Sequence, residues 1–158
     1  MRPVTRHESP WDEGRVPVDA KATGARHNAS MAREISVHCL EDFELAQSDG
    51  MRVVREDVTP LFVAPLGNES AVYEWWSAPA EALGLPLLAS IYEYGFRHGI
   101  RWANGQLKRA QAEVVQLEAH WKSAGLPDDQ LAMRLKRSGY LREALTIAQE
   151  HRAVVIIT

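Results

Sequence analysis

Residues 96–121 read FRHGIRWANGQLKRAQAEVVQLEAHW, and the spacing of the apolar and small side chains in this stretch decides how the chain can fold. Those side chains recur at alternating steps of four and three residues, which is the heptad spacing of a helix that buries one side. We call them the heptad seam: Phe96, Ile100, Ala103, Leu107, Ala110, Val114, Leu117 and Trp121. The pattern predicts a helix whose seam is covered by another apolar surface.

The predicted helix extends from residue 86 to residue 123. Pro86 suits the first helical position, and Gly125 suits the position just past the end. At about 1.5 Å per residue such a helix is roughly 57 Å long, whereas a globule of 158 residues is about 40 Å across. Internal glycines weaken the helix, and a break at Asn104-Gly105 is the alternative. A continuous helix projects from the body and offers its seam to a partner.

Residues 34–66 show the alternation of short antiparallel strands. Ile35 and Val37 alternate with polar residues, and Asp49-Gly50 is a pair favoured in tight hairpin turns. A helix over 36–47 is the alternative. A further short strand at 61–63 should end before Pro65.

The remaining segments complete the expected fold. Asn68 can cap a helix or precede a strand over 69–77, and the sequence does not decide between them. Residues 127–151 read as an αα-hairpin that turns at Ser138-Gly139. The β-branched residues in 153–157 should join the sheet or pair with another chain. We therefore predict one α+β domain over 31–158, after a flexible arm, 1–30, that is disordered or held by a partner.

Composition narrows the function classes. The chain has one cysteine, Cys39, so an intrachain disulfide and a multi-cysteine zinc site are excluded. It has no apolar leader and no apolar run long enough to span a membrane, so we expect a cytoplasmic protein with no membrane partner. The histidines are scattered, and we expect no metal and no cofactor.

Acidic residues gather in the middle of the chain. Residues 34–92 carry ten acidic and two basic side chains, although the whole chain has a net charge of only −3. Our candidates for an acidic surface are Glu41, Asp42, Glu44, Glu56, Asp57, Glu69 and Glu74. Such a surface attracts a basic partner.

The leading functional hypothesis is a non-enzymatic protein–protein interaction module, acting as a small regulator, assembly factor or inhibitor. It would form a homodimer or bind a protein partner through the seam, while the acidic surface occludes a basic, nucleic-acid-binding partner. The residues predicted to bind the partner are Trp11, Phe96, Ile100, Leu107, Val114, Leu117 and Trp121.

Two other classes remain. The alternative is a dimeric regulator with a helix-turn-helix-like unit around Ser138-Gly139. Its candidate nucleic-acid-binding residues are Arg134, Lys136, Arg137 and Arg142. The third class is an enzyme that uses His98, which lies one helical turn from Tyr94 and close to Arg97 and Arg101. No matching nucleophile or carboxylate pair accompanies His98, so this hypothesis ranks last.

Overall fold

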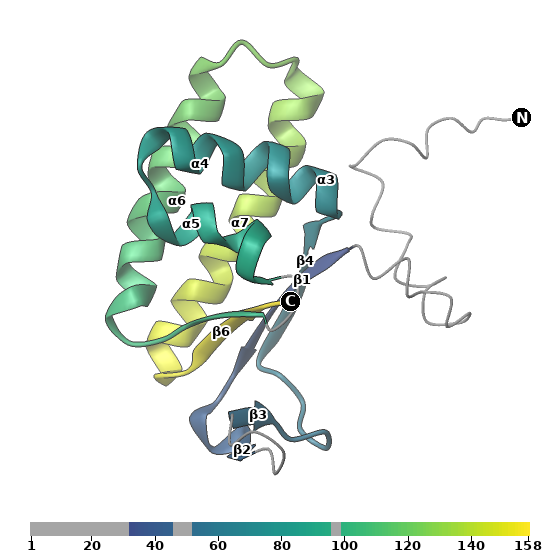
Figure 1. The fold of residues 1–158 in the computed structure, drawn as a ribbon, viewed down its shortest axis with the longest axis vertical. Coiled ribbons are helices and arrows are strands. Elements are labelled where there is room, and N and C mark those ends of the chain that lie inside the picture. The colour runs from purple at the N-terminus through teal and green to yellow at the C-terminus, as the bar shows by residue number, and fades with distance from the viewer. Residues whose placement is uncertain (1–31, 46–51, 96–98) are drawn as a thin grey trace, which may run out of the picture.

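The computed structural model describes residues 32–45, 52–95 and 99–158, and within them it has an α+β fold (Figure 1). The strands are β1 (Arg33–His38), β2 (Phe43–Leu45), β3 (Arg52–Val54), β4 (Phe62–Gly67), β5 (Ile100–Trp102) and β6 (Val154–Ile157). The helical segments are η3 (Leu40–Asp42), α3 (Glu69–Ala71), η4 (Val72–Ser77), α4 (Ala78–Leu83), α5 (Pro86–Gly95), α6 (Gly105–Ser123) and α7 (Asp128–His151). The predicted arm, 1–30, lies outside the described residues.

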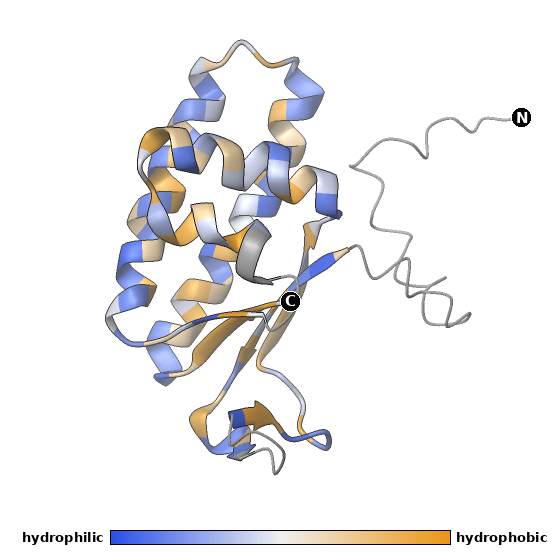
Figure 2. Ribbon diagram, in the orientation of Figure 1, coloured by the Kyte–Doolittle hydropathy of each residue, from blue (hydrophilic) through white to orange (hydrophobic). Residues whose placement is uncertain are grey.

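The main sheet is antiparallel, with the strand order β4-β1-β6-β5. Val37 of β1 lies opposite Phe62 of β4 on one side and opposite Val155 of β6 on the other. The C-terminal strand therefore joins the sheet, as predicted, and its β-branched residues make β6 the most hydrophobic strand in Figure 2. All four residues of β6 are buried.

A second, two-stranded sheet is formed by β2 and β3, which lie away from the helices at the lower end of the molecule in Figure 1. Phe43 lies opposite Val54, and the pairing is antiparallel. Residues 36–38 and 43–45 are thus in strands, as predicted, and only the short 3-10 helix η3 lies between them in place of the alternative helix over 36–47. The predicted turn at Asp49-Gly50 lies outside the described residues.

The segment after β4 is helical. The Asn68 side chain accepts a hydrogen bond from the Ala71 amide at 2.8 Å and caps α3. η4, which is π-helical, and α4 continue this helix to Gly84, whose φ of +75° ends it. The expectation that Pro65 ends the preceding strand is wrong: β4 continues to Gly67, because β4 is an edge strand and loses no ladder bond to a proline there.

The prediction of one continuous helix over 86–123 is wrong. α5 ends at Gly95, Ile100–Trp102 pair with β6 as β5, and α6 begins at Gly105. Gly99, with φ of +76°, comes so close to the sheet that an added Cβ would lie 2.9 Å from Thr158 Cγ2. The strand forms because it satisfies backbone groups along an edge of β6 that would otherwise be unpaired.

The predicted αα-hairpin over 127–151 is also wrong. α7 is a single helix in which Ser138 and Gly139 are interior residues. The Ser138 hydroxyl donates to the Glu118 carboxylate and to the Leu135 carbonyl, so it serves the helix rather than a turn. The helical hairpin is instead made by α6 and α7, which pack together on either side of Gly125.

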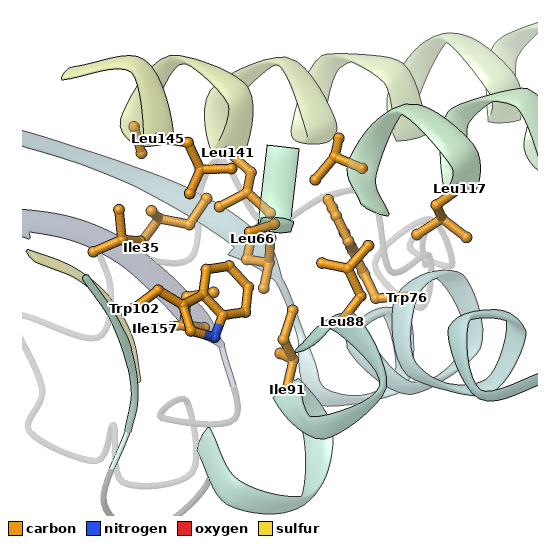
Figure 3. Close-up of a cluster of buried hydrophobic side chains, with 14 of the residues drawn as sticks. Ile35, Leu66, Trp76, Leu88, Ile91, Trp102, Leu117, Leu141, Leu145 and Ile157 are labelled. Carbon is orange, nitrogen blue, oxygen red and sulfur yellow. The ribbon is translucent and has the colours of Figure 1, made fainter. Parts of the chain in front are cut away.

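The heptad seam from Leu107 to Trp121 lies in the core of the protein. Leu107, Val114, Leu117 and Trp121 are at most 2% exposed. The Trp121 indole donates to the Trp75 carbonyl at 3.0 Å. Figure 3 shows neighbouring parts of this core, where Leu141 and Leu145 of α7 lie beside side chains of the sheet. The chain therefore covers its own seam.

No helix in the described ranges is long and apolar enough to cross a membrane.

Candidate functional site

The candidate site lies on the β2–β3 end of the molecule. We define the acidic ribbon as residues 39–45 and 52–57, which include η3, β2 and β3. These residues carry five carboxylates and two arginines. The carboxylates are those of Glu41, Asp42, Glu44, Glu56 and Asp57. Five of the seven predicted acidic residues are thus brought to one end of the fold.

The other two predicted acidic residues lie elsewhere and face cations of their own chain. Glu69 forms an ion pair of 3.5 Å with Arg33, whose side chain is only 2% exposed. Burial lowers the pKa of Arg33, and Glu69 opposes that shift. Burial also lowers the pKa of Arg134, and the charge of Glu74 opposes it. Neither Glu69 nor Glu74 belongs to the acidic ribbon.

A pocket of about 450 Å³ opens between the acidic ribbon and the edge of the main sheet. Leu40, Phe43 and Arg52 line it from the ribbon; Arg101, Ala103 and Val154 line it from the sheet side. We call it the ribbon pocket. Leu40 is 59% exposed, although it is a large apolar side chain. The pocket therefore has mainly apolar walls with two arginines, and Glu41 and Asp42 directly follow its residue Leu40 in the chain.

Arg101 joins the acidic ribbon to the main sheet. Its guanidinium carbon lies 5.5 Å from the centroid of the Phe43 ring, and its Nη1 donates to the Arg52 carbonyl. Within the ribbon, the Arg55 amide donates to the Asp42 carbonyl at 2.8 Å. These contacts hold both halves of the ribbon against the sheet and keep the pocket formed.

His38 lies beneath this junction. Its ring makes an edge-to-face contact with Phe43 at 6.4 Å, and it is 8% exposed. In the described part of the chain, Nδ1 has no hydrogen-bond partner. Burial lowers the pKa of His38, and the charge of Asp42 opposes that shift. We infer that the neutral ring is the form that packs under the ribbon.

Four of the seven predicted partner-binding residues lie in the core. Leu107, Val114, Leu117 and Trp121 are enclosed by the chain, and Ile100 is half-buried in β5. Trp11 and Phe96 lie outside the described residues. The seam is therefore not available as a docking face while the domain is folded.

The basic residues of the helix-turn-helix alternative are mostly used within the chain. Arg134 lies over the Trp75 ring at 5.1 Å, Arg137 is 4% exposed, and Arg142 pairs with Glu118 at 3.0 Å. Lys136 is exposed. The turn that this motif needs at Ser138-Gly139 is absent from α7.

The residues proposed for an enzyme are not brought together in the described structure. His98 and Arg97 lie outside the described residues, as does the side chain of Tyr94, and Arg101 is committed to the acidic ribbon. No group of three His, Cys, Asp or Glu residues suited to a metal occurs in the ranges that the structure describes.

The sequence argument did not identify the ribbon pocket, because its lining comes from segments far apart in the chain. One feature pointed to it: Leu40 is a large apolar residue directly before Glu41 and Asp42. Arg101 was considered only for its spacing from Arg97, and its contact with Phe43 depends on the fold.

No protein-family model, curated protein or solved structure matches this chain.

Proposed function

We propose that this protein is a non-enzymatic interaction module that binds a basic protein surface through the acidic ribbon. The observation that carries the proposal is the gathering of five carboxylates on a two-stranded ribbon apart from the helical body. A partner that uses a basic face to bind nucleic acid would be blocked from doing so while that face is bound to the acidic ribbon. The protein would then act as a small regulator or inhibitor.

The charges on the ribbon favour a cationic partner over an anionic one. Glu41, Glu44, Glu56 and Asp57 are exposed. Asp57 forms an ion pair of 3.5 Å with Arg55. Clustered charges of one sign raise association rates by about 10- to 1000-fold, and salt weakens that effect. Binding should therefore weaken as the salt concentration rises.

The proposal no longer uses the heptad seam, because its side chains are needed for the core. A homodimer through the seam would require the domain to open, at the cost of exposing Leu117 and Trp121 to water. DNA binding is retained as an outcome of the test. Of its four candidate residues, Lys136 and Arg142 are exposed, and Arg142 pairs with Glu118.

The test is a selection from a display library of random short peptides on the full-length protein. We expect the selected peptides to be rich in lysine and arginine. A ribbon variant, Glu41→Lys with Glu44→Lys and Glu56→Lys, should lose about tenfold or more of the affinity for them. A control with equal charge change, Glu81→Lys with Glu143→Lys and Glu150→Lys, alters exposed residues outside the ribbon and should bind much better than the ribbon variant.

Three results would count against the proposal. Selected peptides without basic enrichment would remove the electrostatic argument. Equal losses of peptide affinity in the ribbon variant and its control would show that binding depends on the net charge of the protein and not on the position of the charges in the ribbon. Salt-sensitive binding of duplex DNA by the unaltered protein, with no peptide selected, would favour the DNA-binding alternative.

A further inference from the structure

We propose that the ribbon pocket receives a bulky apolar side chain from the same basic segment that the acidic ribbon binds. The occupant is thus an extended protein segment that carries lysine or arginine around one aliphatic or aromatic anchor. This inference rests on the proposed function and names the sequence that the partner should present.

The chemistry of the walls argues for an apolar anchor. Leu40, Phe43, Ala103 and Val154 supply most of the lining side chains, and Val154 is only 6% exposed. The volume of about 450 Å³ falls within the range of roughly 300–1,000 Å³ typical of small-ligand pockets. One large side chain fits this space.

Leu40 links the pocket to the carboxylates. It is the most exposed of the large hydrophobic residues in the described part of the chain, and Glu41 and Asp42 follow it within η3. A segment held by these carboxylates therefore passes directly over Leu40. An apolar pocket surrounded by a polar rim is the usual arrangement of a binding hot spot.

The two arginines of the pocket are compatible with a basic segment. Arg101 is engaged by the Phe43 ring and the Arg52 carbonyl, so its charge is directed into the junction. Arg52 is exposed on the rim, and a guanidinium group only donates hydrogen bonds. It is thus suited to the backbone carbonyl oxygens that an extended segment presents. Five carboxylates outnumber the two arginines of the ribbon and keep it attractive to cations.

The other occupants that fit the walls differ in charge. A lipid tail or an apolar small molecule fills the pocket without using the carboxylates, and a free anion uses only the arginines. Leu40 lines the pocket and directly precedes Glu41 and Asp42 in η3, and this placement favours a ligand that is apolar at one point and basic beside it.

The experiment uses the same peptide selection on the full-length protein. We expect the basic peptides to share one leucine, isoleucine, phenylalanine or tryptophan at a fixed position. Binding of a labelled, selected peptide is then measured by fluorescence anisotropy for Leu40→Ser, Leu40→Glu and the control Leu83→Ser. Leu83 is exposed like Leu40 but lies at the end of α4, outside the ribbon.

Leu40→Ser should weaken binding by about tenfold, whereas Leu83→Ser should change it by less than about twofold. Leu40→Glu is the sharper variant, because it adds negative charge to the ribbon. Pure electrostatic attraction predicts tighter binding of a basic peptide, and the pocket predicts weaker binding. Replacing the anchor of the peptide by serine should reduce the affinity of the peptide for the unaltered protein. The same replacement should change its affinity for Leu40→Glu very little, because that variant has already lost the anchor contact.

The two proposals fail in different ways. Basic peptides with no fixed apolar position, or tighter binding by Leu40→Glu, would overturn the anchor and leave the acidic ribbon standing. Peptides with an apolar anchor but no basic residues would overturn the proposed function and leave the pocket. Equal binding by Leu40→Ser and Leu83→Ser would also overturn the anchor.

Discussion

Glu113 provides the sharpest test of how the start of α5 is held against α6. It belongs to α6 and is only 6% exposed, and its carboxylate bonds to backbone amides at the start of α5. Its Oε1 accepts from the Leu88 amide at 2.9 Å and its Oε2 from the Leu87 amide at 3.3 Å. The carboxylate thus satisfies two amide donors of a helix N-terminus that has no acceptor within its own helix.

The magnitude follows from these contacts. Glu113→Ala leaves a buried and a part-buried amide without their acceptor, at about 1–3 kcal/mol for a fully buried donor and less for the other. Loss of a carboxylate near the helix dipole adds about 0.3–1 kcal/mol. The substitution also removes the free-energy cost of burying a charged carboxylate, and this gain offsets part of the loss. We expect a net loss of roughly 2–4 kcal/mol in the free energy of unfolding. Glu113→Gln keeps an oxygen acceptor and should lose about half as much.

Urea denaturation followed by tryptophan fluorescence measures the change, since the chain has five tryptophans. Hydrogen exchange should show faster exchange of the Leu87 and Leu88 amides in Glu113→Ala. The control is Glu143→Ala on the exposed side of α7, with an expected change within about 0.5 kcal/mol. If Glu113→Ala matched that control, the carboxylate would not be what holds the start of α5, and the reasoning would be refuted.

Four further predictions concern the stability of the fold. In α7 an alanine Cβ at Gly139 meets no atom within 4 Å, so Gly139→Ala should raise the unfolding free energy by about 0.5–1 kcal/mol in urea denaturation. A loss of stability would instead indicate a turn there. Gly99→Ala should lower it by more than about 1 kcal/mol, because φ is +76° and the Cβ would collide with the sheet; an unchanged urea midpoint would contradict this. Trp121→Phe removes the indole donor to the Trp75 carbonyl and should cost about 1–3 kcal/mol by the same assay, and a neutral result would contradict that contact. Burial lowers the pKa of His38 below its ordinary 6.5, so the unfolded chain takes up the proton first as the pH falls. The stability due to the neutral ring is complete above about pH 6.5 and declines below it, by at most about 1.4 kcal/mol per pH unit, until the folded pKa is passed. The unfolding free energy of His38→Gln should depend less on pH over this window than that of the unaltered protein. If the two proteins showed the same dependence on pH, His38 would be excluded as the cause.

Local sequence patterns predicted several parts of the fold correctly. The alternation of Ile35 and Val37 with polar residues predicted a strand with apolar side chains on one face. The β-branched run at 154–157 predicted another strand, because β-branched residues favour strands, and the two strands pair in the sheet. Asn68 was recognised as a possible cap because its side chain can replace a missing helical acceptor. The seam between Leu107 and Trp121 has the period of α6 and is buried as that period requires.

The errors arose where two structures satisfy the same local pattern. A step of four from Phe96 to Ile100 suits a helix, but only the tertiary structure brings an unpaired edge of β6 beside residues 100–102. Gly139 suits a turn, but neighbouring turns of one helix bury Leu141 and Leu145 on the same side, and packing against the sheet outweighs the weakness of one glycine.

The sequence by itself determined the class of fold and the acidic character of its middle section, because propensity, capping and charge are properties of neighbouring residues. The burial of the seam from Leu107 to Trp121 and the existence of the ribbon pocket depend on tertiary contacts. The pocket joins Leu40, Arg52, Arg101 and Val154, which lie far apart in the chain. Contacts between distant segments depend on which backbone edges and apolar faces meet, and no local pattern encodes that choice.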